Sequence, residues 1–79
     1  MNNTTEIGWE ISKTANQFKS SCVLKFGKII IDAKSILGVF VSLSEHHNYE
    51  LYVMGPDEDE AKRAMSDLFA RYDLSYTIK

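Results

Sequence analysis

The side chains that could carry chemistry in this 79-residue chain are few, and they do not cluster along the sequence. The two histidines, His46 and His47, are adjacent in a polar stretch that we expect to be a loop. Two neighbouring imidazoles supply too few ligands for a metal site. We therefore expect both histidines to be solvated loop residues, and we expect the protein to use no metal and no other cofactor.

The single cysteine, Cys22, excludes an internal disulfide and any cysteine-based zinc site within one chain. A reactive thiol needs a cationic, exposed setting, which the residues around Cys22 do not indicate, so we expect an inert core residue. The sequence also contains no nucleophile–base pair and no glycine-rich phosphate loop. These features argue against an independent enzyme.

Length and charge narrow the class of protein further. The net charge is −2, so no basic field attracts nucleic acid or an anionic membrane. No apolar run approaches the roughly 20 residues that span a bilayer, and the first residues do not resemble a signal peptide. Because 79 residues are too few for two cores, we expect one cytoplasmic domain over residues 1–79.

The elements that must position these side chains follow from the spacing of apolar residues. Spacings of three and four predict helices, and alternation predicts strands. We expect helices over residues 4–18, 36–43 and 57–72, and strands over residues 21–26, 28–32, 49–54 and 74–79. Helices with a single apolar stripe beside mostly alternating strands predict a two-layer α+β sandwich.

Two helix starts depend on individual residues. In residues 36–43, Val39, Phe40 and Val41 suit a strand, whereas Ser35 is a favoured N-cap residue. We predict a short helix capped by Ser35. We expect Pro56 at the first position of the last helix, where its missing N–H costs nothing and four acidic residues follow in the first turn.

Several segments together match a known pattern: Phe18-Lys19-Ser20, Gly27-Lys28, Asp32-Ala33-Lys34-Ser35-Ile36-Leu37-Gly38-Val39, Ser42-Leu43 and Gly55-x-Asp57-Glu58-x-x-Ala61. The pattern resembles the histidine-containing phosphocarrier protein (HPr) family of the bacterial sugar phosphotransferase system, over about residues 4–72. The run from Ala33 to Gly38 is its most specific part. The resemblance implies an HPr-like α+β sandwich, in which three helices cover one face of an antiparallel sheet.

The resembling family carries a phosphoryl group on a histidine at the start of its first helix, in a His-x-Arg-Pro motif. Counting back without gaps from Phe18 places that histidine at Thr4, the arginine at Glu6 and the proline at Ile7. Threonine cannot replace the reversible chemistry of imidazole, and glutamate would repel a phosphate. We therefore expect a non-catalytic regulatory or protein-binding module. The alternatives are a phosphocarrier that uses another residue or is represented by a shortened chain, and a degenerate paralogue without a partner.

The resemblance also implies two sites for partners of the phosphotransferase-system type. Ser35 matches a serine that a dedicated kinase phosphorylates in many Gram-positive members; the alternative is a residue that only caps the helix. Ile36, Leu37 and Phe40 match part of the family's docking face; the alternative places all three in the core. Trp9 lies off the apolar stripe of its helix, and we expect it to cover an edge or an interface.

The family's first strand has no counterpart in the sequence, which begins at the first helix. Residues 49–54 would then present an unpaired backbone edge. We predict that residues 74–79 fill this place. Within one chain the tail would run parallel to residues 49–54, with the last helix as the crossover. A swapped tail would instead make a symmetric dimer. We favour the single chain, and expect a monomer or a strand-swapped homodimer.

Overall fold

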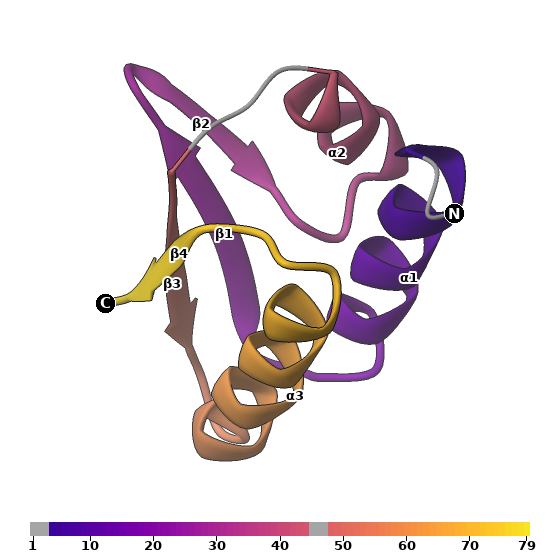
Figure 1. Ribbon diagram of the computed structural model, residues 1–79. Helices are drawn as coiled ribbons and strands as arrows, with labels where there is room; N and C mark the ends of the chain where they lie inside the picture. The colour runs from indigo at the N-terminus through magenta and orange to yellow at the C-terminus, as the bar shows by residue number, and fades with distance from the viewer. Residues whose placement is uncertain (1–3, 45–47) are drawn as a thin grey trace.

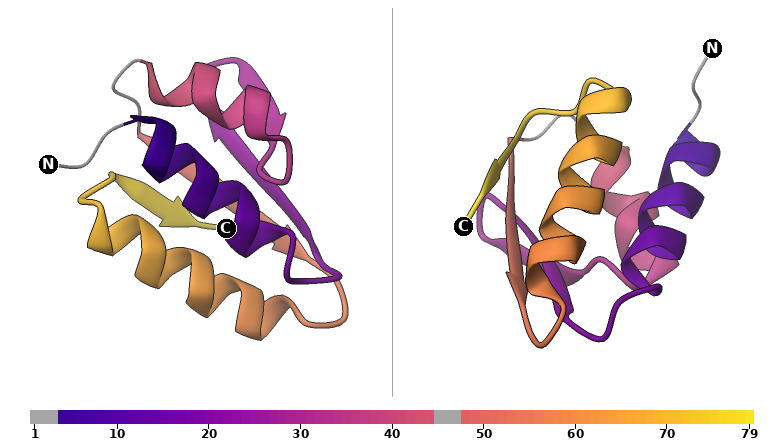
Figure 2. Two further views of the ribbon diagram at one scale, coloured as in Figure 1. Left: turned by 90° about the vertical axis from the view of Figure 1, so that its right-hand side faces the viewer. Right: turned by 90° about the horizontal axis from the view of Figure 1, so that it is seen from below.

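The computed structural model describes residues 4–44 and 48–79. In this part of the chain the elements are α1 (Thr4–Ala15), β1 (Ser21–Phe26), β2 (Ile29–Asp32), α2 (Ile36–Leu43), β3 (Tyr49–Met54), α3 (Glu58–Arg71) and β4 (Tyr76–Ile78). The three helices lie on one face of the sheet and leave its other face open (Figure 1; Figure 2, right). The α+β sandwich and the order of its elements are those predicted from the sequence.

The sheet has the strand order β2-β1-β3-β4. Strand β1 pairs antiparallel with both β2 and β3, whereas β4 pairs parallel with β3, so the sheet is mixed rather than wholly antiparallel. The tail therefore occupies the edge beside β3 within the same chain, as the single-chain prediction states. Two hydrogen bonds fix the register of the tail against β3. The Tyr49 N–H donates to the Ser75 carbonyl, and the Lys79 N–H donates to the Leu51 carbonyl.

The turn that returns the tail to the sheet is a helix C-terminal motif. Asp73 lies in the left-handed region at φ 59°. The N–H of Asp73 donates to the Ala70 carbonyl at 3.1 Å, and the N–H of Leu74 donates to the Phe69 carbonyl at 2.9 Å. These are the two bonds of a Schellman motif, in which glycine is the usual left-handed residue. The motif ends α3 and directs the chain alongside β3.

The core lies between the helices and the inner face of the sheet. Alternate residues of β1 and β3 point into it, as the predicted alternation requires. The Tyr49 ring makes edge contacts with Phe26 and Phe69, at centroid distances of 5.6 and 5.8 Å. Its hydroxyl donates to the Ser42 carbonyl at 2.9 Å, and burial raises the pKa of Tyr49. This aromatic cluster joins β1, β3 and α3.

The first helix is shorter than predicted. It ends at Ala15 rather than at residue 18, because the chain turns at residues 16–20 to enter β1. The Asn16 amide donates back to the Ser12 carbonyl at 2.8 Å. Phe18 still packs against the core from this turn. The apolar stripe was thus identified correctly, but its last member lies beyond the helix.

The start of the last helix also differs from the prediction. The helix begins at Glu58, with Asp57 in the N-cap position, so Pro56 precedes the helix instead of opening it. Asp57 makes no side-chain bond to its own helix. Its carboxylate instead accepts hydrogen bonds from Lys19 and Ser20, in the loop between α1 and β1. The helix therefore begins two residues later than predicted, at Glu58 and not at Pro56.

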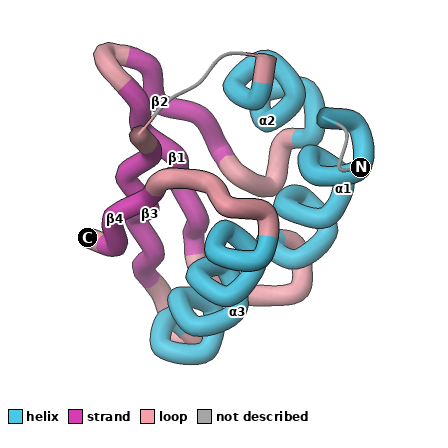
Figure 3. The backbone as a smooth tube through the Cα atoms, in the orientation of Figure 1, coloured by secondary structure: helices cyan, strands magenta, loops and turns pink. Residues whose placement is uncertain are grey.

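The helices are short (Figure 3). Within residues 4–44 and 48–79, none is long and apolar enough to cross a membrane.

Candidate functional site

The start of α1 is the position at which the resemblance would place a phosphoryl carrier. Thr4 is the first residue of the helix and is exposed, and Glu6 lies in its first turn. A carboxylate there interacts favourably with the helix dipole but opposes the approach of a phosphate. Ile7 packs against the core. His46 and His47 lie outside the described residues, and no metal-binding group of side chains occurs among the residues that the structure describes.

Ser35 caps α2, as predicted. Its backbone is extended, with φ −91° and ψ 110°, and its hydroxyl oxygen accepts the N–H of Gly38 at 3.5 Å. The backbone before it is fixed by Asp32, whose carboxylate accepts the Lys34 N–H and whose carbonyl accepts the Ser35 N–H, both at 2.9 Å. The Ser35 side chain is therefore held, exposed, at the N-terminus of a helix.

The segment before α2 is tied to the end of α1. The Lys34 ammonium donates to the Phe18 carbonyl at 2.9 Å. In the other direction, the Lys34 carbonyl accepts the hydroxyl of the buried Ser12 at 3.0 Å and the amide of Asn16 at 3.1 Å. These bonds join residues that are 16 to 22 positions apart in the sequence, so they set the position of Ser35 relative to α1.

Apolar side chains are exposed on both α1 and α2, which pack against each other. Leu37 is 73% exposed and Val41 is 70% exposed, and their spacing of four puts them on one side of α2. On α1, Trp9 is 56% exposed. We call Trp9, Leu37 and Val41 the α1–α2 apolar surface. Val41 is not among the residues predicted for a docking face, although its spacing of four from Leu37 on a helix indicates that both lie on one side.

The other two residues expected on a docking face are only partly exposed. Ile36 and Phe40 have intermediate exposure. The Phe40 ring lies directly against Gly8, where a Cβ atom would clash with it. Gly8, a weak helix former, therefore allows α1 and α2 to approach each other. Leu37 is exposed, so the alternative that places all three residues in the core does not hold for it.

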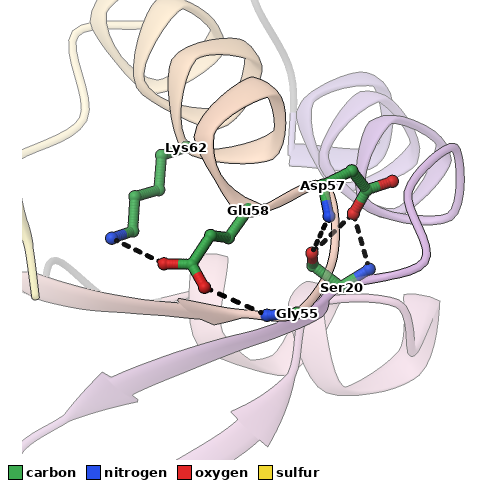
Figure 4. A network of polar contacts seen from close by, with 5 residues as sticks. All are labelled: Ser20, Gly55, Asp57, Glu58 and Lys62. Atoms are coloured by element: carbon green, nitrogen blue, oxygen red, sulfur yellow. Dashed lines mark hydrogen bonds and ion pairs between the residues drawn. The ribbon is translucent and has the colours of Figure 1, made fainter.

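A polar network joins the loop after α1 to the start of α3 (Figure 4). The Asp57 carboxylate accepts the hydroxyl and the N–H of Ser20 at 2.5 and 2.9 Å, and the N–H of Lys19 at 2.9 Å. The Ser20 hydroxyl, followed by these N–H groups, lowers the pKa of Asp57 to about 2. Nearby, Glu58 accepts the Gly55 N–H and pairs with Lys62 at 3.4 Å. We interpret the network as a structural clamp, because its acceptors bind groups of the chain itself.

Cys22 lies in β1 with its thiol fully buried. Burial raises the pKa of the thiol, and its sulfur lies 3.9 Å from the Ser20 carbonyl. The thiolate required for reactivity is therefore disfavoured.

Comparison with solved structures supports the fold. The HPr dimer from Thermoanaerobacter tengcongensis has a TM-score of 0.77 and 27% identity, over 91% of this chain and 82% of that one. Crh, the catabolite repression containing protein of Bacillus subtilis, has a TM-score of 0.72 and 26% identity, over 85% and 78%. The histidine-containing phosphocarrier protein of Mycoplasma shares the fold at 18% identity, with a TM-score of 0.74 over 95% and 83%.

Comparison with curated proteins gives no match. The family model "PTS HPr component phosphorylation site" matches residues 7–71, which include the turn after α1, both sides of the Ser35 cap and all of α3. By that match, and by the fold it shares with the solved HPr proteins, the chain belongs to the HPr family of phosphotransferase-system proteins.

Proposed function

We propose that this chain is a regulatory, protein-binding member of the HPr family that carries no phosphoryl group itself. It docks on proteins of the phosphotransferase-system type through the α1–α2 apolar surface. The observation that carries this proposal is the exposure of Leu37 and Val41 on a helix whose other side packs against α1. In a folded protein this small, large apolar side chains that remain exposed together on one helix side are typical of an interaction site.

The composition of the surface suits protein contacts. Trp9 offers a large, rigid side chain of the kind that dominates binding energy in interfaces. Leu37 and Val41 add apolar area that water now covers. Burying such a side chain is favourable by roughly 1.5–3 kcal/mol. The surface can thus supply affinity without any covalent chemistry.

The start of α1 supports a role without phosphoryl transfer. Thr4 lacks an imidazole, and Glu6 brings a negative charge into the turn where a phosphate would bind. The likeness to Crh, whose name refers to catabolite repression, is in keeping with regulation as the function of this chain.

Ser35 is the regulatory residue in this proposal. Ser35 is exposed two residues before Leu37, and its hydroxyl oxygen accepts the Gly38 N–H in the first turn of α2. A phosphate on Ser35 would meet the positive end of the helix dipole and would add negative charge beside the docking surface. Modification would therefore change which partner the surface accepts.

Titration of the unmodified chain with the first enzyme of the phosphotransferase system tests the docking surface. We expect Leu37→Ser to weaken binding about tenfold or more, since it removes an exposed apolar anchor without touching the core. Met54→Ser is the matched control, because Met54 is equally exposed but lies on the open face of the sheet. Equal affinities for Leu37→Ser and the unmodified chain would contradict the proposal.

A further inference from the structure

Strand β2 is an edge of the sheet. It is hydrogen-bonded to β1 on one side, and on the other side no strand of the described part of the chain pairs with it (Figure 1). Its residues are Ile29, Ile30, Ile31 and Asp32, which have high strand propensity apart from the last. Ile29 is 52% exposed and Ile30 is 66% exposed. No proline and no inward-pointing charge interrupts the strand, and only its short length and Asp32 at its end limit pairing along this edge.

The direction of the backbone groups along this edge follows from the pairing with β1. Ala33 N–H donates to the Cys22 carbonyl at 2.8 Å, so Ala33 faces β1. In an antiparallel pair the direction alternates, and therefore Ile31 and Ile29 also face β1, opposite Leu24 and Phe26. The N–H and carbonyl of Ile30 and the N–H of Asp32 consequently point to the free edge.

Two opposite charges flank Ile30, because Lys28 ends the hairpin turn before β2 and Asp32 ends the strand itself. When a second copy runs antiparallel and Ile30 faces its own counterpart, the turn residue Lys28 of each copy lies level with Asp32 of the other. Ile29 then faces Ile31 across the same axis. In this register the N–H of each Ile30 donates to the carbonyl of the other Ile30, which gives two hydrogen bonds between the copies. One ion pair between Lys28 and Asp32 then lies on each side of these bonds. A shift by one residue would lose both ion pairs.

We propose that β2 pairs with β2 of a second copy of this chain, centred on Ile30, to form a weak two-fold symmetric dimer with a continuous sheet. This surface is distinct from the α1–α2 apolar surface and does not depend on the proposed function. The occupant is a second copy because Lys28, in the turn before β2, and Asp32, at the end of β2, carry opposite charges and are each two residues from Ile30. A symmetric axis turns that arrangement into two attractive contacts.

The open face of the sheet adds apolar area next to the proposed axis. Val23, Lys25, Ile30 and Tyr52 line a shallow groove of about 250 Å³ on this face. The Ile30 side chain forms its rim nearest the free edge, because β2 is the outermost strand. Pairing of two β2 strands brings the two Ile30 side chains together and removes part of this apolar surface from water.

A charge-exchange experiment tests the pairing. Lys28→Asp places aspartate opposite Asp32, and Asp32→Lys places lysine opposite Lys28, so each variant alone carries two repulsive contacts. An equimolar mixture of the two variants restores two attractive contacts in a heterodimer. Sedimentation equilibrium over a range of concentrations is expected to show a wild-type dimer, at least about tenfold weaker association for each variant, and recovery in the mixture.

Two controls separate pairing from altered folding or net charge. Lys13→Asp and Asp67→Lys make the same charge changes at exposed helix positions and should leave dimerisation unchanged. Asp32 also accepts the Lys34 N–H, so Asp32→Lys is compared with Asp32→Asn, which keeps an acceptor. We expect Asp32→Asn to weaken the dimer severalfold without lowering the melting temperature to the same extent.

Hydrogen exchange gives a second, local measurement on the unmodified chain. The Ile30 amide is expected to exchange more slowly as the concentration rises, whereas the outward amides of β4 do not change. Wild-type protein that stays monomeric at every concentration would overturn the proposal. So would a mixture of the two charge variants that associates no better than each variant alone.

Discussion

The carboxylate of Asp57 accepts a hydrogen bond from the hydroxyl of Ser20 at 2.5 Å, although the two residues are 37 positions apart in the sequence. The Ser20 hydroxyl in turn accepts the Asp57 N–H at 3.2 Å, so the two residues bond to each other in both directions (Figure 4). This contact joins the loop after α1 to the N-cap of α3. It explains why Asp57 does not cap its own helix.

The first prediction concerns the stability of the fold in acid. The pKa of Asp57 is about 2 in the folded protein, against an ordinary value of 3.8. A lowered pKa stabilises the folded state fully above the ordinary value, and this contribution is lost as the pH falls through about 2. We expect Asp57→Asn to flatten the decline in melting temperature between about pH 4 and pH 2. Asp59→Asn, at an exposed position of α3, should keep the wild-type decline. Identical profiles for wild type and Asp57→Asn would contradict the assignment.

The second prediction concerns the contact between Gly8 and Phe40. Alanine favours a helix interior by about 1 kcal/mol over glycine, so Gly8→Ala would stabilise an isolated helix. Because its Cβ would overlap the Phe40 ring, we expect Gly8→Ala to lower the free energy of unfolding by about 1–3 kcal/mol. Phe40→Leu in the same chain should recover part of the loss. Additive effects of the two substitutions, measured by denaturant unfolding, would show that the contact is unimportant.

The third prediction concerns the turn after α3. Asp73 occupies a left-handed conformation that glycine adopts without steric cost. We expect Asp73→Gly to raise the free energy of unfolding by about 1 kcal/mol, while Asp73→Val lowers it. Asp67→Gly, within α3 itself, serves as the comparison and should be destabilising. A loss of stability on Asp73→Gly would indicate that the Asp73 side chain has another role.

The fourth prediction concerns Ser35. An aspartate can accept the same N–H bonds as serine at an N-cap, and the helix dipole favours its charge. We therefore expect Ser35→Asp to change the free energy of unfolding by less than about 1 kcal/mol. Ser35→Ala should cost about 1 kcal/mol, because it leaves the helix uncapped. A loss of more than about 2 kcal/mol on Ser35→Asp, in thermal or denaturant unfolding, would not fit an exposed cap.

Local patterns were sufficient to predict most of the fold. Burial of one face of an element produces a periodic pattern of apolar residues that can be read from the sequence. This pattern is present in the helical stripe from Ala61 to Phe69 and in the alternation of residues 21–26 and 49–54. The position of the tail followed from a different argument, since an unpaired edge beside β3 had to be filled.

What the patterns missed depends on contacts between distant segments. The bond between Asp57 and Ser20 has no local signature, so Pro56 was placed at the wrong helix position. Gly8 weakened the prediction of the first helix when considered alone, but in the structure it is the point at which α2 approaches. The exposure of Leu37 and Val41 likewise depends on what covers α2, and this could not be deduced from an apolar run.

The central claim is that the chain binds partners without carrying phosphate, and one measurement tests it directly. The labelled chain is incubated with the first enzyme of the phosphotransferase system and phosphoenolpyruvate, with an HPr protein that carries the histidine as the positive control. The account predicts that backbone signals of Leu37 and Val41 shift in the nuclear magnetic resonance spectrum, while the chain gains no acid-labile phosphate. Acid-labile phosphate on this chain at a rate near that of the control would contradict the account.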